Sequence, residues 1–203
     1  GIFVITILIG SGNPAWALNF FELEVYPYET AGQGELELES LNSYVINGQR
    51  DADPGQVATH HLWRTSLEAA YGVTDHLEVA GYLDLALTAN GRFDYAGSRF
   101  RGRYRFFEKD QIPINLGLYT EIELPNQRFS DNDTEIELRL ILEKDLGPLT
   151  VQLNPILEKS MNGVDSSVGI EFQYAAKGYY RFRPWLMPGI EFYGDFGPLT
   201  HFE

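Results

Sequence analysis

The stretch Arg99-Phe100-Arg101-Gly102-Arg103-Tyr104-Arg105-Phe106 alternates strictly between arginine and an uncharged residue. Successive side chains of a β-strand point to opposite faces of the sheet. One face of this stretch is therefore cationic, while the other can lie in an apolar medium. The stretch predicts a β-strand that separates two different environments.

The same alternation recurs in residues 114–124 and 134–143, where isoleucine and leucine occupy one row and mostly polar or charged side chains the other. No segment has a convincing helical period, so the pattern predicts an all-β chain. Nine spanning strands are expected, at residues 35–46, 57–71, 76–89, 97–107, 113–124, 134–143, 148–158, 167–181 and 187–195. Pro155 interrupts the seventh of these, so a count wrong by one is an open alternative.

The N-terminus indicates export. Residues 2–9 form an uncharged apolar run, and Ala15-Trp16-Ala17 is a small-x-small tripeptide typical of signal peptidase sites. The run is too short for a membrane-spanning helix. Since neither Met nor a basic region precedes it, we interpret residues 1–17 as a partial signal peptide. A buried first strand is the alternative, although residues 10–14 would break it.

Connection lengths favour an antiparallel up-and-down transmembrane β-barrel of the bacterial outer membrane. Short joints are expected at residues 72–75, 108–111, 144–148 and 183–187, and longer polar loops at 47–56, 89–97, 125–133 and 160–166. Short turns at one end and long loops at the other are typical of Gram-negative outer-membrane barrels. Residues 18–33 are then a periplasmic or lumenal lead-in, and 34–203 an incomplete barrel. Because bacterial barrels normally have an even strand number, one to three further strands are expected after residue 203.

Two segments resemble a known family. Tyr71-Gly72-Val73-Thr74-Asp75-His76-Leu77-Glu78 is similar to a turn, and residues 182–194 are similar to the later hairpins, of transporter-like outer-membrane β-barrels associated with the meta-cleavage pathway of phenol degradation. The resemblance covers roughly residues 34–197. It implies an outer-membrane barrel with a transport role, and it supplies no catalytic residues.

Composition excludes several classes of function. The chain has no cysteine, which rules out a disulfide scaffold and a Cys-ligated metal site, and its formal charge of -14 argues against nucleic-acid binding. The four histidines form no spaced metal set, and residues 130–133 lack the spacing of a calcium loop. Ser66 and His60 show no spacing of a hydrolase site. We therefore expect no enzyme activity, no cofactor and no metal.

The polar rows would line the interior of the barrel. The candidate pore-lining residues are Arg99, Arg101, Arg103, Arg105, Glu121, Glu123, Glu135, Glu137 and Arg139. A short turn at 108–111 would set Arg99 opposite Glu121 and Arg101 next to Tyr119. The arginine row is then either a structural comb of ion pairs or a ladder that sets a field across a pore.

The loop at 125–133 would place Glu121 and Glu123 near Glu137 and Glu135. Like charges in such proximity require a cation, Arg139 or water between them. This patch is predicted to be the cation-attracting wall of the interior, with a register error as the alternative. Trp63 and Tyr71, eight residues apart on one outer row, suit the two aromatic girdles of a membrane barrel or ordinary packing.

These patterns together predict a porin-like outer-membrane channel for passive transport of small polar or aromatic-acid solutes. Its partners would be outer-membrane lipid and small solutes, and the sequence does not indicate an oligomeric state. The first alternative is a structural or anchoring outer-membrane barrel without an open pore. The second is a soluble lipocalin-like binding barrel, whose interior would be the apolar row.

Overall fold

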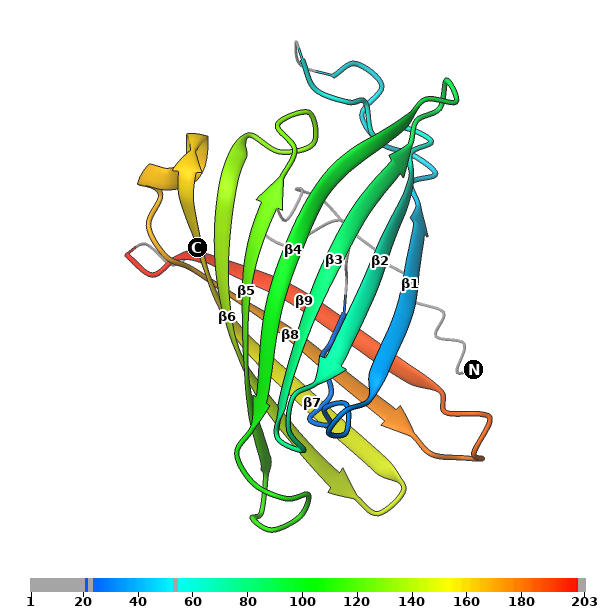
Figure 1. The fold of residues 1–203 in the computed structure, drawn as a ribbon, viewed down its shortest axis with the longest axis vertical. Helices are drawn as coiled ribbons and strands as arrows, with labels where there is room; N and C mark the ends of the chain where they lie inside the picture. Colours follow the sequence, from blue (N-terminus) through cyan, green and yellow to red (C-terminus); the bar gives the residue numbers. More distant parts are fainter. Residues whose placement is uncertain (1–20, 22–23, 53–54, 201–203) are drawn as a thin grey trace.

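The computed structural model describes residues 21, 24–52 and 55–200. Within these ranges, nine antiparallel strands form one sheet in which every strand pairs with its neighbours in sequence (Figure 1). The strands are β1 Leu36–Tyr44, β2 Trp63–Gly72, β3 Leu77–Leu87, β4 Phe93–Arg105, β5 Asn115–Pro125, β6 Asn132–Leu146, β7 Leu149–Gly163, β8 Glu171–Tyr180 and β9 Gly189–Pro198. A single turn of 3-10 helix, η1 Val164–Ser167, follows β7. The prediction of an all-β, up-and-down sheet with nine strands is confirmed.

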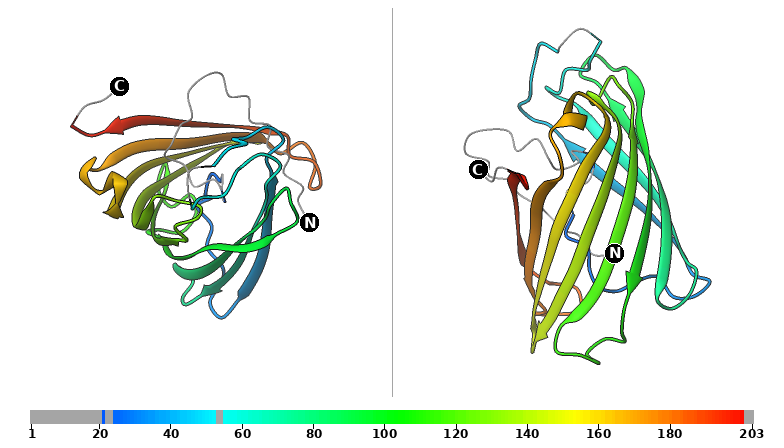
Figure 2. Two further views of the ribbon diagram at one scale, coloured as in Figure 1. Left: turned by 90° about the horizontal axis from the view of Figure 1, so that it is seen from above. Right: turned by 90° about the vertical axis from the view of Figure 1, so that its left-hand side faces the viewer.

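Pro155 does not interrupt β7, because it pairs with Tyr174 in the β7–β8 register. The strand count is therefore the one predicted. The partial signal peptide at residues 1–17 and the additional strands after residue 203 lie outside the described residues. Among the described residues, β1 and β9 form the two edges of the curved sheet (Figure 2).

Three strand starts were predicted wrongly. The eighth strand begins at Glu171 rather than residue 167, because the 3-10 turn η1 ends at Ser167 and Gly169 follows with a φ of 107°. The second strand begins at Trp63 rather than residue 57, because His61 has a φ of 57° and the chain turns just before the strand. The fourth begins at Phe93, since Gly91 at a φ of 80° lets residues 88–92 close a tight turn. The predicted long loop at 89–97 is therefore short, and the connection at 106–114 is longer than predicted. Short turns and long loops are therefore only partly separated between the two ends of the sheet.

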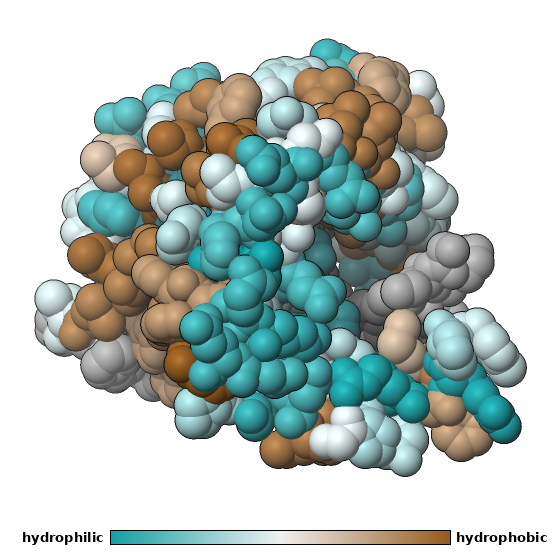
Figure 3. Space-filling view, turned by 60° about the horizontal axis from the view of Figure 1, so that its bottom comes forward, coloured by the Kyte–Doolittle hydropathy of each residue, from teal (hydrophilic) through white to brown (hydrophobic). Residues whose placement is uncertain are grey.

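The two faces of the sheet have opposite chemistry. On β2 and β4, the buried residues are mainly polar or charged, and the exposed ones alternate with them and are mainly apolar. Leu67 and Leu83, which pair across β2 and β3, are each 41% exposed, whereas Glu78 is fully buried. In Figure 3, apolar side chains follow the flank and hydrophilic ones gather over the end that carries the β4–β5 and β6–β7 turns. The concave face is thus polar and the convex face apolar.

The segment before β1 runs along the concave face, inside the curve of the sheet (Figure 2). Val25, Tyr26, Tyr28 and Ala31 are all buried there. Tyr26 and Tyr28 form an apolar cluster with Tyr119 and Ile141 on the inner rows of β5 and β6. None of the helical structure in the described residues is long and apolar enough to cross a membrane.

Candidate functional site: the polar concave face

The sequence-predicted site residues share the concave face of β4, β5 and β6. Arg99, Arg101, Arg103, Glu121, Glu123, Glu137 and Arg139 are buried, whereas Arg105 and Glu135 are half-buried. They lie on one face because each strand alternates its side chains across the sheet. The structure therefore brings all nine residues into one polar surface.

Arg99 and Arg101 of β4 are ion-paired with carboxylates of neighbouring strands. The Arg99 guanidinium donates to Asp84 at 3.0 Å and to the Ser66 hydroxyl at 2.8 Å, and it lies 3.5 Å from Glu121. Arg101 bridges Glu68 and Glu78.

The other two β4 arginines are paired as well. Arg103 donates to Glu78 at 2.8 Å, and Arg105 lies 2.9 Å from Glu108. The arginine row therefore forms a comb of ion pairs, one of the two alternatives that the sequence left open. Its acidic partners come from β2, β3, β5 and the β4–β5 connection.

The predicted register between β4 and β5 is wrong by two residues. Arg99 pairs with Glu123, and Arg101 with Glu121. The shift arises because the connection spans residues 106–114: Asp110 has a φ of 63°, and its N–H donates to the Asn115 side chain at 2.8 Å. The ion pair between Arg99 and Glu121 persists as a diagonal contact.

The predicted register between β5 and β6 is confirmed. Glu121 pairs with Glu137 and Glu123 with Glu135, so carboxylates face one another across the two strands. Arg139 compensates part of this charge, because its Nε and Nη2 atoms donate to the two Glu137 oxygens at 2.8 and 3.0 Å. A bidentate pair of this kind is among the stronger polar contacts in proteins.

Three tyrosines lie among the guanidinium groups. Arg99 lies over the Tyr82 ring at 4.1 Å, and Arg139 lies 4.9 Å from the Tyr26 ring and 5.0 Å from the Tyr119 ring. Cations at such distances are attracted by the electron-rich ring faces. Tyr82 and Tyr119 lie on inner rows that alternation identifies, but no periodic signal marks Tyr26.

A lysine in the β4–β5 connection joins the sheet to the segment before β1. Lys109 Nζ lies 3.2 Å from Glu29, 3.5 Å from Glu143 and 3.4 Å from Asp145. Burial lowers the pKa of Lys109, but the hydrogen bond and attraction of Glu29 and the charges of Glu143 and Asp145 outweigh it. The net effect raises the pKa above its ordinary value, so Lys109 stays charged at neutral pH.

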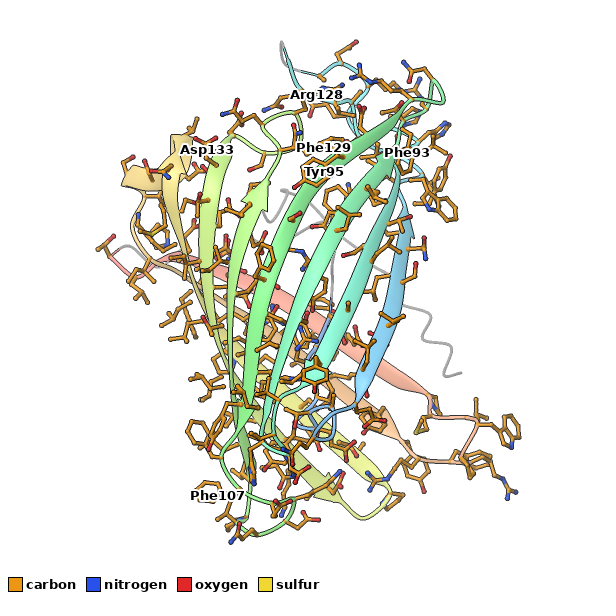
Figure 4. The ribbon with its side chains drawn as sticks, in the orientation of Figure 1. Phe93, Tyr95, Phe107, Arg128, Phe129 and Asp133 are labelled. Carbon is orange, nitrogen blue, oxygen red and sulfur yellow. The ribbon has the colours of Figure 1, made fainter. Side chains whose placement is uncertain are left out.

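At the opposite end, the loops cover the concave face with an apolar cluster. Leu62, Ala86 and Ala96 are buried there, and Val57 and Phe129 pack against them. Arg128, labelled beside Phe129 in Figure 4, lies 2.7 Å from Asp94 of β4. The β1–β2 and β5–β6 connections therefore fold inward at this end.

The histidines occupy separate places. The His60 and His61 rings stack with centroids 4.0 Å apart in the β1–β2 connection, while His76 lies 3.1 Å from Glu108 at the other end. His201 lies outside the described residues. In the part of the chain that the structure describes, no group of three or more His, Cys, Asp or Glu side chains is arranged to hold a metal ion.

Comparisons with protein-family models, with curated proteins and with solved structures found no match. The resemblance to transporter-like outer-membrane barrels therefore stays a prediction.

Replacing Arg101 with Met should lower the free energy of unfolding by about 3–5 kcal/mol, because Glu68 and Glu78 would lose a buried partner. Urea unfolding followed by tryptophan fluorescence measures the change. Arg92→Met is the matched control: its side chain is 60% exposed, so a change within about 1 kcal/mol is expected. Adding Glu68→Gln to Arg101→Met should recover part of the loss. Equal effects of Arg101→Met and Arg92→Met would contradict the structural role of the comb.

Proposed function

We propose that this chain is a porin-like channel of the bacterial outer membrane that passes small polar or aromatic-acid solutes passively. The observation that carries the proposal is the inverted distribution of side chains. The outward rows of β2, β3, β4 and β5 hold no Asp, Glu, Lys or Arg, and many of their leucines and aromatic residues are exposed. An exposed apolar surface of this extent calls for a partner that is itself apolar, and lipid meets that need.

Aromatic residues at both ends of the convex face support a membrane position. Trp63 and Tyr71 are each 46% exposed, and Phe93 and Tyr95 mark one end of β4 while Phe107 follows its other end (Figure 4). The eight residue steps from Trp63 to Tyr71 span about 26 Å along the strand at about 3.3 Å per residue. At the tilt of about 35–45° of a barrel strand, this length covers about 19–22 Å of the apolar band, which is about 25 Å tall. Such belts are typical of the two membrane interfaces.

The concave face supports passage of polar solutes. It carries rows of carboxylates and guanidiniums within a few ångströms of each other, and such rows attract or repel ions according to their local balance. Four glutamates face one another on β5 and β6, and Arg139 is the basic residue beside them on those two strands. The neighbouring Arg99 and Arg101 of β4 are shared with further carboxylates on β2 and β3. This balance favours a preference for cations.

The arrangement argues against a soluble lipocalin-like barrel, because such a barrel needs its apolar row inside. An anchoring barrel without a pore shares the same convex face. Conductance of the full-length protein in planar bilayers under a salt gradient distinguishes it from a channel. Steady conductance supports the proposal, and a folded, heat-modifiable barrel that does not conduct would contradict it.

Leu67→Arg should destabilise the membrane-folded protein by about 2–4 kcal/mol, because it places a cation midway between Trp63 and Tyr71 in the apolar band. Val73→Arg, just beyond Tyr71 in the β2–β3 turn, is the matched control and should cost about 0–1 kcal/mol. Urea unfolding from lipid vesicles measures both. A membrane position would be refuted by equal and small costs for the two variants.

The double variant Glu121→Gln/Glu137→Gln should shift the reversal potential toward anion preference. It removes two carboxylates from the concave face and leaves Arg99 and Arg139 with fewer counter-charges. Asp51→Asn/Asp110→Asn removes the same charge from exposed connections and should change selectivity little. Unchanged ion selectivity in the Glu121→Gln/Glu137→Gln protein would contradict the prediction that this patch attracts cations.

A further inference from the structure

Residues 24–34, here called the plug segment, follow the concave face before the chain enters β1 (Figure 2). The segment does not pair with the sheet as a strand. Several of its main-chain groups are instead bound by side chains of the inner rows. It therefore occupies space that the curvature of the sheet encloses.

The main-chain contacts extend along the segment. The Asn154 side chain accepts from the Tyr26 N–H at 2.8 Å and donates to the Tyr26 carbonyl at 3.3 Å. Glu143 accepts from the Tyr28 N–H at 3.1 Å, and Glu78 accepts from the Ala31 N–H at 2.6 Å. These contacts come from β7, β6 and β3, so the segment crosses the width of the sheet.

The other end of the segment is bound by a cation. Arg139 of β6 donates to the Glu24 carbonyl at 3.0 Å. Hydrogen bonds in which one partner is ionised are stronger than neutral ones. Carboxylates or guanidiniums thus hold the segment at Glu24, Tyr28 and Ala31.

Two tyrosines of the segment fill the space between the inner rows. Tyr26 is 2% exposed, its ring centroid lies 4.5 Å from that of Tyr119, and its hydroxyl lies 3.1 Å from that of Tyr82. Tyr28 is 1% exposed, and its hydroxyl donates to the Phe107 carbonyl. These rings are the bulkiest parts of the segment on the concave face.

The main chain of the plug segment passes close to Gly72 of β2, where only a glycine leaves enough space. A Cβ atom at Gly72 would lie 2.0 Å from the Gly32 carbonyl oxygen and 2.7 Å from that of Ala31. Both contacts are with main-chain atoms, which cannot move away without displacing the segment. At this position the plug segment and any side chain on β2 exclude one another.

A small hydrophilic cavity remains beside the segment. It has a volume of about 130 Å³, and its walls include Glu24, Tyr26, Glu68, Arg101 and Arg103. This volume holds several water molecules or one solute somewhat smaller than benzene. Water, small ions and small solutes therefore have space next to the segment, while molecules much larger than benzene do not.

We propose that the plug segment is an internal constriction that sets the width of the pore and is released by breaking its main-chain contacts. The inference rests on the proposed channel function. It adds that this chain's own residues 24–34 determine which solutes pass. Displacing the segment should widen the path without altering the lipid-facing surface.

Gly72→Ala is the direct test, because the added methyl group meets the segment's main chain. Gly178→Ala on β8 is the matched control, since a Cβ atom there has no neighbour within 4 Å. In planar bilayers, the full-length Gly72→Ala protein should show at least a twofold higher single-channel conductance than the wild type and the Gly178→Ala protein. Asn154→Ala, which removes both bonds to Tyr26 without crowding, should act in the same direction.

A labelling experiment reports the segment's position independently of conductance. The chain has no cysteine, so Ala31→Cys introduces a single thiol at a buried position of the segment. A charged thiol reagent should modify it slowly alone or with Gly178→Ala, and at least tenfold faster with Gly72→Ala. Heat-modifiable gel mobility verifies that each variant is folded.

The outcomes separate the two proposals. Equal conductance and equal labelling in the Gly72→Ala and Gly178→Ala proteins would overturn the plug and leave the channel function intact. Faster labelling with unchanged conductance would overturn the claim that the segment sets the pore width. If no folded variant conducts, the channel function fails and the pore-width inference fails with it.

Discussion

Charge pairing on the concave face is the constraint on which the rest of the structure depends. A carboxylate removed from water is stable only when cations or hydrogen-bond donors surround it. Glu78 is fully buried, and it accepts from Arg101, Arg103 and the main-chain N–H of Ala31. One carboxylate thus joins β3, β4 and the plug segment. The alternation seen first in the arginine row has its physical reason here, because a buried charge needs a partner on the same face of the sheet.

The convex face follows from the same alternation. Because the charged side chains lie on the concave face, where they pair, the alternate side chains lie on the convex face. These are apolar over most of β2 to β5. The sheet therefore separates a polar interior from an apolar exterior, the reverse of a soluble sandwich. Little apolar material is left to fill the concave side. Its apolar clusters are small and include Tyr26, Tyr28, Leu62 and Ile141.

Period-2 alternation predicted the strands well, because it depends only on neighbouring residues. It also gave the pairing of Glu121 with Glu137, where the connecting loop had been placed correctly. Arg99 was predicted to pair with Glu121, but it pairs with Glu123, so the predicted register is wrong by two residues. Register depends on the length of the turn, and no pattern in the sequence indicates the positive φ of Asp110 that shapes this turn.

The contacts of the plug segment could not be predicted from the sequence pattern. Tyr26 is hydrogen-bonded to Asn154, which lies 128 positions further along the sequence. Its hydroxyl also accepts a hydrogen bond from that of Tyr119, 93 positions away. A segment that is neither strand nor helix has no periodicity to indicate which face it covers. The sequence placed it before the first strand as a periplasmic or lumenal lead-in, and it could not identify the partners of the segment.

The way in which Asn154, Glu143 and Glu78 hold residues 26, 28 and 31 has an evolutionary consequence. Since they contact N–H and carbonyl groups that almost every amino acid provides, most side chains of the segment are free to change without loss of these bonds. Proline is the exception at these positions, because it lacks the N–H. Divergence in this segment can thus alter the chemistry lining the interior while the surrounding wall keeps its sequence.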